Sequence, residues 1–249
     1  MHDIDFLICP RYGNAIKAFA LPLVDLTSRE SKLPEGLKNK PPSLTRSEFH
    51  NRVFPVLAAM ASFNEYLESA VQRELINALH TGLLSKECNK ICISALTACA
   101  LEMKRSMYHV IPQVLLNFSK ISATKMIASP MLEFLSTLIR LPDIFSSFTD
   151  TNYMSVFAIA LPFTNPFKFD AYIVSMAHHI LIMWFLKCRL SYRQNFVQFI
   201  VTGLNSNLRH APSTSAIAKQ GEPQPTSLDI QNSELLISII IENSITAFS

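Results

Sequence analysis

Glycine is scarce in this chain, and its scarcity limits the folds that the chain can adopt. Only 5 of the 249 residues are Gly, about 2% where ~7% is usual. Nucleotide-binding folds need Gly-rich turns to approach phosphate, and all-β folds use Gly at hairpins and bulges. Five scattered glycines supply neither. We therefore expect a helical chain, and its 49% hydrophobic content excludes a disordered one.

Charge and cysteine usage narrow the class of protein further. The 22 Lys and Arg residues against 19 Asp and Glu give a net charge of +3, too small to favour nucleic acid, which calls for a clustered basic face. Five cysteines, mostly in apolar contexts, are typical of reduced thiols in an intracellular protein. The N-terminus lacks the pattern of a secretory signal. We expect a cytoplasmic protein.

The pattern of hydrophobic and polar residues changes twice along the chain, which predicts three parts. Residues 1–44 are predicted to be a flexible N-terminal segment, since residues 28–43 mix Pro, Lys and Ser without an apolar period. Thr45 and Glu48 form a T-x-x-E capping box that opens a helical domain over residues 45–204. Residues 205–249 are rich in Ser, Thr, Pro and Gln and are predicted to be a disordered tail.

Helix start signals recur through the helical domain at Thr45, Ser85, Ser122 and Asn165. They lie 40, 37 and 43 residues apart, close to the about 40–47 residues of a two-helix HEAT-type repeat. Such pairs bury their apolar faces by stacking on their neighbours. The predicted fold class is therefore all-α, a HEAT-like α-solenoid of about four helix pairs. An irregular helical bundle is the alternative.

Apolar residues at helical spacing mark the faces that we expect to be buried. They are Leu67, Val71, Leu75 and Ala78; Cys88, Cys92, Leu96, Cys99 and Met103; Met131, Leu135 and Leu138; and Phe196, Ile200 and Leu204. Gly82 follows the first group and is expected to be an αL cap. Trp184 is expected in the core.

Two groups of residues have side chains capable of chemistry. Cys88, Cys92 and Cys99 could offer three thiolates to zinc, but no fourth ligand is adjacent, so we favour small side chains packed in a core stripe. His178 and His179 point about 100° apart on a helix and cannot easily share a metal. We expect partly buried imidazoles hydrogen-bonded to backbone or hydroxyl groups. No catalytic residue, cofactor or metal site is predicted.

Two apolar runs need separate interpretation. Residues 171–186 contain no Asp, Glu, Lys or Arg, but they fall short of the ~17 residues that a membrane-spanning helix requires. We expect a helix buried among other helices. Residues 235–241 (LLISIII) are β-prone and suit either a docking segment or an aggregation-prone strand.

Three blocks of the sequence resemble the central helical region of the tuberin family. They are residues 121–141; residues 153–193, with LPFTNPFKF, the His178–His179 pair and MWFLKCRL; and, more weakly, residues 47–97. The resemblance implies an α-solenoid that binds a hamartin-like coiled coil. It also implies a complex that activates GTP hydrolysis by a Rheb-like small GTPase and restrains TOR signalling, attached to lysosomal or other endomembranes only through partners.

The resemblance implies a scaffold and no enzyme. The family's catalytic asparagine belongs to a C-terminal domain that has no match in these 249 residues, and the Rheb-like GTPase would be reached through that domain. Two hypotheses remain beside this one. The chain itself could act on a GTPase through a residue such as Asn165, although Asn165 precedes Pro166 and suits a turn better. An independent helical module could hold a ligand or metal at the cysteine stripe.

The tail carries one further motif that resembles the family. Thr226–Ser227–Leu228 matches the short context of a kinase site. Gln224 and Glu222 stand where the family has arginines, so the paired guanidinium charge read by a basophilic kinase is missing. Regulation at Ser227 is therefore not expected.

Overall fold

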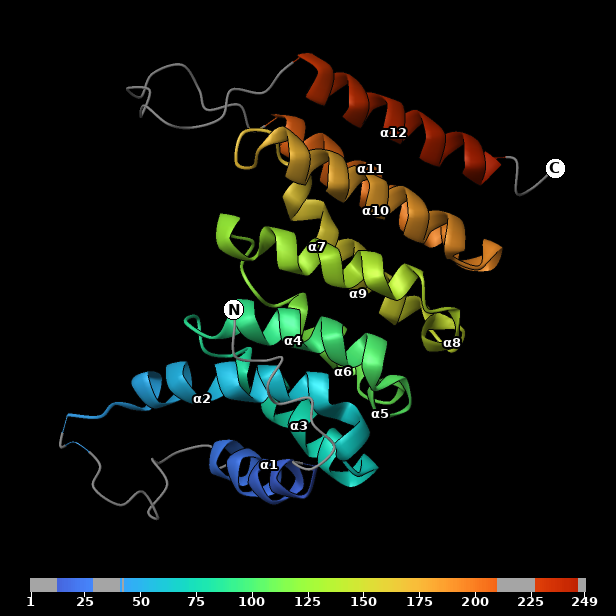
Figure 1. Cartoon of the computed structure of the whole chain (residues 1–249). Helices are drawn as coiled ribbons and strands as arrows, with labels where there is room; N and C mark the ends of the chain where they lie inside the picture. The colour runs from blue at the N-terminus through green and yellow to red at the C-terminus, as the bar shows by residue number, and fades with distance from the viewer. Residues whose placement is uncertain (1–12, 29–40, 42, 210–226, 246–249) are drawn as a thin grey trace. The chain divides into compact units, whose positions relative to one another are not determined.

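The computed structural model describes residues 13–28, 41, 43–209 and 227–245 (Figure 1). These residues are helical or lie in turns between helices, and none of them forms a strand. The chain divides into two compact units, Met1–Ile111 and Pro112–Ser249. The all-α fold class is therefore confirmed, while the finer assignment to HEAT-type repeats stays a prediction.

The first unit is a stack of helices around α3 and α4. In chain order its described elements are α1 (Gly13–Ser28), α2 (Arg46–Met60), the 3-10 helix η3 (Ala61–Tyr66), α3 (Ser69–Gly82), α4 (Asn89–Glu102) and α5 (Lys104–Tyr108). Helices α2, α3 and α4 contact one another, and α1 packs on α2 and α3.

The capping box predicted at Thr45 and Glu48 is confirmed. The Glu48 amide donates to Thr45 Oγ1 at 3.2 Å, and the Thr45 amide donates to Glu48 Oε2 at 2.9 Å. These two bonds satisfy backbone donors that the first turn of α2 leaves without helical partners. The bonds from Thr45 also lower the pKa of the Glu48 carboxyl, because its charged form accepts them.

Helix α1 contradicts the prediction of a flexible segment over residues 1–44. Ala20 and Val24 lie four residues apart and are both buried, so one face of α1 packs within the unit. Pro22 lies inside this helix, where proline normally ends a helical pattern, and it therefore obscures the helical period. Residues 1–12 and 29–40 lie outside the described part of the chain.

Gly82 is the last residue of α3 but is not the αL cap that we expected. Its φ does not lie in the left-handed region. A β-carbon there would stand 2.5 Å from Cys92 Sγ and 2.5 Å from Phe54 Cε1, and both side chains are completely buried. Glycine is required because α2 and α4 approach α3 too closely for any side chain.

The second unit is built around α10. Its described elements are α6 (Ile111–Phe118, which begins at the boundary), α7 (Lys125–Ile139), α8 (Pro142–Phe145), α9 (Asp150–Ala160), the 3-10 helix η4 (Leu161–Thr164), α10 (Ala171–Lys187), α11 (Leu190–Arg209) and α12 (Ser227–Ile245). Helix α10 contacts α7 and α9 as well as α12, and α12 also contacts α11 (Figure 1).

Trp184 lies at the centre of the second unit's core, as predicted. Its ring is completely buried and stacks on Phe148 at a centroid distance of 5.8 Å and an interplanar angle of 6°. Phe145 and Tyr153 meet it edge-on at 5.5 and 6.0 Å. The indole Nε1 donates to the Leu135 carbonyl at 3.2 Å, which ties α10 to α7 and satisfies the buried donor.

The other faces predicted from helical spacing are also buried, from Leu67 to Leu204. The helices that follow the predicted start signals begin at Arg46, Asn89, Lys125 and Ala171. Residues 171–186 form most of α10, which packs on α7, α9 and α12. The expected burial is only partial, because Tyr172 and Leu186 are 67% and 42% exposed. Of the helices that the structure describes, none combines the length and apolarity needed to cross a membrane.

The prediction of a disordered tail is wrong for residues 205–209 and 227–245, the parts of the tail that the structure describes. Helix α11 continues to Arg209, and α12 occupies Ser227–Ile245, so residues 235–241 are helical and form no strand. Ser233, Leu236 and Ile240 lie three and four residues apart and are all buried. Packing on α10 and α11 outweighs the β-propensity of the isoleucines. Residues 210–226 lie outside the described residues.

Candidate functional site

Local bonds at both ends of α10 determine where it begins and ends. Asp170 caps its N-terminus, because the Ile173 amide donates to Asp170 Oδ1 at 3.0 Å. At the other end the Arg193 guanidinium donates to the carbonyls of Leu186 at 2.7 Å and Cys188 at 3.3 Å. These carbonyls lie in and just after the last turn, where helical donors run out.

The turn before α10 explains the role of Asn165. Asn165 is buried, and its Oδ1 accepts a hydrogen bond from the Phe167 amide at 2.9 Å. This closes an Asx turn at the Asn165–Pro166 break, in agreement with the sequence-based expectation. The geometry therefore gives no support to Asn165 as a residue that projects toward a nucleotide.

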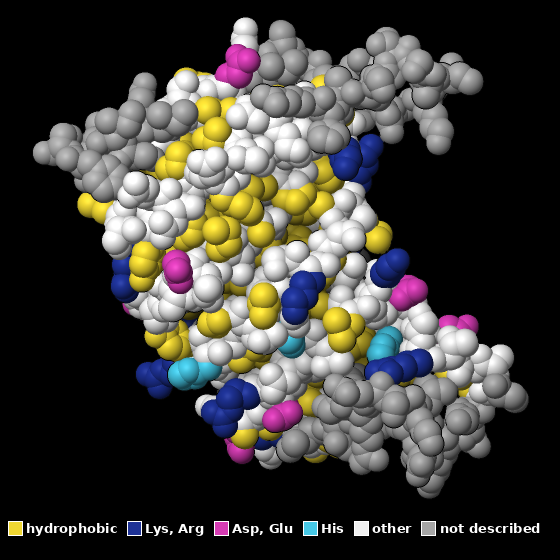
Figure 2. Space-filling view, turned by 180° about the vertical axis from the view of Figure 1, so that it is seen from behind, with side chains coloured by type: hydrophobic (Ala, Val, Ile, Leu, Met, Phe, Trp, Pro, Cys, Tyr) yellow, Lys and Arg dark blue, Asp and Glu magenta, His cyan; other side chains and the backbone are white. Residues whose placement is uncertain are grey.

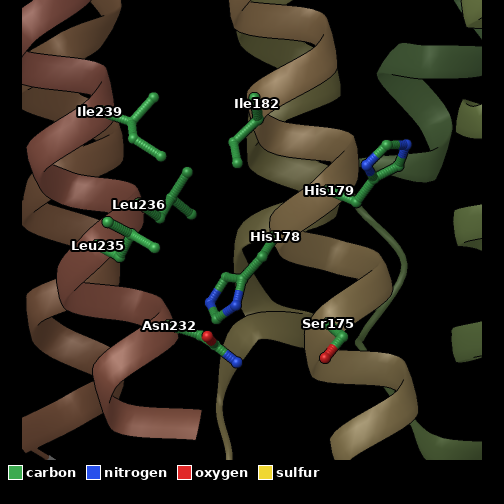
Figure 3. A pocket seen from close by; sticks show the side chains of 8 residues that line it. All are labelled: Ser175, His178, His179, Ile182, Asn232, Leu235, Leu236 and Ile239. Atoms are coloured by element: carbon green, nitrogen blue, oxygen red, sulfur yellow. The ribbon is translucent and has the colours of Figure 1, made fainter. Parts of the chain in front are cut away.

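The two adjacent histidines lie on different sides of α10. His178 is buried at 6% exposure, and its Nε2 shares a 3.0 Å hydrogen bond with Ser233 Oγ on α12. His179 is exposed, and Figure 3 shows its ring turned away from α12 while the His178 ring points toward Asn232. The hydroxyl partner predicted for a buried imidazole is confirmed for His178, whereas the predicted burial is wrong for His179.

A cavity of about 250 Å³ lies between α10 and α12. We call it the α10–α12 groove, and its lining consists of Ser175, His178, His179 and Ile182 from α10 and Asn232, Leu235, Leu236 and Ile239 from α12. In Figure 3 the apolar side chains of α12 lie toward Ile182, and Asn232 lies beside the His178 ring, whereas Ser175 and His179 lie farther from α12. The groove thus has an apolar part and a polar part along one seam.

The rim of the groove exposes apolar surface. Leu235 is 59% exposed, and Ile182 and Ile239 are half-buried. Glu234, next to Leu235, is exposed. The sequence of α12 contains three acidic residues and neither Lys nor Arg, while residues 171–186 contain no Asp, Glu, Lys or Arg. None of the described residues that line the groove is Asp, Glu, Lys or Arg, and Glu234 is not among them.

Other apolar side chains are also exposed on the second unit. Figure 2 shows hydrophobic side chains gathered on one face of the molecule, with Lys, Arg, Asp and Glu scattered among them. The large hydrophobic residues of this unit that are at least one-third exposed are Leu116, Met126, Tyr172, Leu186, Leu190, Phe199 and Leu235. Apolar surface of this kind is typical of sites that contact other proteins.

The cysteine stripe of α4 forms part of the packed core. Cys88, Cys92 and Cys99 are all at most 1% exposed, and all are free thiols. Burial raises the pKa of Cys92 far above its ordinary value and that of Cys99 to about 12, so both stay protonated at neutral pH. Within the described residues, no group of three or more His, Cys, Asp or Glu side chains could hold a metal ion.

The contact between His178 and Ser233 has no signal in the sequence, because these residues lie 55 positions apart. A serine beside a histidine suggests a nucleophile and its base. Here Ser233 is 1% exposed and lies inside α12, where the backbone amides are used in the helix and cannot form an oxyanion hole. The pair is therefore best described as a polar contact that holds α12 on α10.

The buried residues of α12 carry only a weak signal in the sequence. Ser233, Leu236 and Ile240 follow the helical period, but the isoleucine-rich run among them points locally to a strand. The α10 side of the groove was identified only through its histidines. Tertiary packing determines which side chains of α10 and α12 meet, and no local sequence pattern reveals these contacts.

These features define an all-α protein of packed helices whose chemically reactive residues are used for packing, capping and contacts between helices. A family model described as Tuberin matches residues 4–191. The chain is also similar to the Tuberous sclerosis 2 protein homolog of Schizosaccharomyces pombe (strain 972), with 30% identity over 161 residues.

The chain belongs to the tuberin family. The alignment with the Schizosaccharomyces pombe relative covers 57% of this chain and 12% of the relative, so the chain spans only a small part of the relative's length. The family match begins before α1, which agrees with the packing of α1 on α2 and α3. It ends at the start of α11, so most of α11 and all of α12 lie outside it.

Proposed function

We propose that this chain is a helical scaffold segment of a tuberin-type protein and binds a hamartin-like coiled coil. The observation that carries the proposal is the family match over residues 4–191. Packed helices offer extended surfaces along which a partner helix can lie. The exposed apolar side chains of the second unit, with Leu190 and Leu235 among the most exposed, supply the anchors that such a contact needs.

The wider role is proposed for the complex and not for these residues alone. In that role the complex activates GTP hydrolysis by a Rheb-like small GTPase and restrains TOR signalling, with the activating residue supplied by a separate domain. The setting is cytoplasmic, and any membrane attachment is made through partners. Nucleic acid has no part in this function, in keeping with the net charge of +3.

Binding to the coiled coil can be measured directly with the full chain. The purified protein is titrated calorimetrically with the coiled coil of a hamartin-like protein, and with an unrelated coiled coil of equal length as the control. We expect saturable binding to the first only, with a negative heat-capacity change from apolar burial. Absence of binding by a chain that is folded by circular dichroism would refute this function.

A GTP hydrolysis assay separates the scaffold from a direct activator. The full chain is added to a Rheb-like GTPase, and hydrolysis is compared with the GTPase alone. We expect no stimulation, because activation requires a side chain that reaches the nucleotide. Stimulation by this chain alone would show that it is itself an activator.

A further inference from the structure

We propose that the corner where α10 turns into α11 is a docking site for an acidic amphipathic helix of a partner protein. We call this surface the α10–α11 corner, and it consists of Leu186, Lys187, Arg189, Leu190 and Arg193. The inference rests on the proposed scaffold function, to which it assigns a place in the second unit and a preference for partner charge.

The corner combines exposed apolar side chains with cations. Leu186 and Leu190 are 42% and 57% exposed. Lys187 and Arg189 are also exposed, and Arg193 is half-buried. A single exposed leucine is ordinary, but here two leucines and three cations lie within residues 186–193. Such a surface suits a partner that offers apolar and acidic side chains together.

Hydrogen bonds hold the guanidinium groups of the corner in place. Arg193 donates to the carbonyls of Leu186 at 2.7 Å and Cys188 at 3.3 Å, so its charge lies beside one of the exposed leucines. Arg189 donates to the carbonyl of Ser146 at 3.2 Å. Both cations are thus positioned before a partner arrives, which lowers the entropy cost of binding.

The buried thiol of Cys188 shows that the two guanidinium groups act at one place. Burial raises the pKa of Cys188 to about 12, and the positive charges of Arg193 and Arg189 oppose this rise. Cys188 therefore lies in the field of both guanidinium groups, which form one basic cluster.

The helices that form the corner supply no acidic residue to neutralise it. Residues 171–209, which include α10 and α11, contain four Lys or Arg residues and neither Asp nor Glu. The neighbouring helix α8 carries one exposed carboxylate, Asp143. Among the described residues no carboxylate forms an ion pair with Lys187, Arg189 or Arg193. A carboxylate of a partner would supply the missing counter-charge.

The number of cations favours a protein partner over a lipid surface. Segments that bind anionic lipid carry clusters of about four to eight Lys or Arg, and the corner has three. A partner helix instead brings carboxylates within hydrogen-bond distance of guanidinium groups and places apolar side chains at i, i+3 or i+4 on the exposed leucines. The partner chemistry is therefore a helix with Asp or Glu beside its apolar stripe.

The test uses the full chain and a defined probe. The probe is a helical peptide of Leu and Glu with leucines at i, i+3, i+4 and i+7, and its counterpart has Lys in place of Glu. Lys187→Glu reverses one charge of the corner and leaves the hydrogen bonds of Arg189 and Arg193 intact. The matched variant Lys168→Glu makes the same charge change at an exposed residue before the other end of α10.

A second pair of variants tests the apolar part of the corner. Leu190→Ser removes an exposed leucine without changing the charge. Its control is Leu84→Ser in the first unit, where the leucine is 80% exposed. Circular dichroism confirms that each variant is folded.

We expect saturable binding of the Leu/Glu peptide, weakened by added salt, and at least about tenfold weaker binding of its Lys counterpart. Lys187→Glu and Leu190→Ser should each bind the Leu/Glu peptide at least about fivefold more weakly, and the two controls should stay within about twofold of the unaltered chain. No binding of this peptide, or equal binding by Lys187→Glu and Lys168→Glu, would overturn the proposal. Binding to anionic phosphatidylserine vesicles without binding to the peptide would assign the corner to a membrane and would also overturn it.

The hamartin-like coiled coil distinguishes this inference from the proposed function. Equal binding of the coiled coil by the unaltered chain and Lys187→Glu would leave the scaffold function standing and overturn the corner as its place. If the coiled coil does not bind while the Leu/Glu peptide binds as expected, the scaffold function fails, and the corner stands as a site for another acidic helix.

Discussion

Helices α4 and α10 each lie within one unit and each carries residues associated with catalysis or metal binding, yet they use those residues differently. On α4 the cysteines are packed in a core where Cys92 and Phe54 closely approach Gly82. On α10 the side toward α7 is closed by Trp184, whereas the side toward α12 leaves a groove beside His178. One helix is enclosed by packing, and the other keeps an open seam.

The comparison of α4 with α10 shows how the burial of a reactive side chain determines its role. Burial raises the pKa of the α4 thiols until they are inert at neutral pH. His178 instead shares a hydrogen bond with Ser233 beside a cavity. We therefore expect mutations in the closed regions to change stability more than mutations at exposed positions.

The largest stability effect is expected for Trp184→Ala. Loss of the ring from the Phe148 stack should lower the free energy of unfolding by about 3–5 kcal/mol. The control is Tyr172→Ala on the same helix, 67% exposed, with an expected change within about 0.5 kcal/mol. Urea titration followed by circular dichroism measures both, because the variant lacks the only tryptophan of the chain. Similar small effects for both variants would show that α10 is not the core helix.

A pair of glycines compares packing in the two units. In Gly82→Ala the new β-carbon would lie 2.5 Å from the buried Phe54 ring and Cys92 sulfur, and relief of this overlap should cost about 1–3 kcal/mol. In Gly203→Ala the nearest atoms are methyl groups of Leu161 at 2.9 and 3.1 Å, which can move. A gain of about 1 kcal/mol in helix propensity offsets the remaining strain at Gly203.

Thermal and urea unfolding of the two glycine variants measure this contrast. We expect Gly82→Ala to be clearly less stable than the unaltered chain and Gly203→Ala to be nearly neutral. The reverse order would contradict the close approach of α2, α3 and α4.

A smaller effect is expected at the contact between α10 and α12. Ser233→Ala removes the hydrogen bond to His178 and should cost about 0.5–1.5 kcal/mol. Ser238→Ala is the matched control, since Ser238 is exposed on the same helix and its hydroxyl donates to the Glu234 carbonyl of that helix at 3.3 Å. Its expected change is within about 0.5 kcal/mol. Equal losses in urea titrations of the two variants would show that the His178 contact contributes nothing to the docking of α12.

Particular residues show how far the sequence could predict this fold. The capping box at Thr45, the α4 stripe and the burial of Trp184 follow from local patterns, because spacing and cap chemistry act within a few residues. Helices α1 and α12 could not be predicted in the same way, since Pro22 and the isoleucine run point locally to other structures that tertiary packing outweighs. Gly82 is predicted correctly at the end of a helix, but as an αL cap. Close packing against Phe54 and Cys92 is what requires glycine there.

The groove itself could not be predicted from the sequence. It depends on which residues of α12 meet His178 and Ile182 across the long stretch of chain between the two helices, and single-sequence spacing carries no such information. The exposure of Leu235 is equally a result of how α12 rotates on α10 and α11. The histidine pair identified one side of the site without indicating what faces it.

Hydrogen–deuterium exchange on the full chain, with and without a saturating hamartin-like coiled coil, tests the central claim most directly. We expect the partner to slow exchange in peptides that carry exposed apolar side chains of the second unit, such as Tyr172, Leu190 and Leu235, while peptides from α4 are unchanged. Slower exchange confined to the first unit, or no change anywhere in the second unit when binding is saturated, would contradict the proposal that the second unit supplies the anchors for the coiled coil.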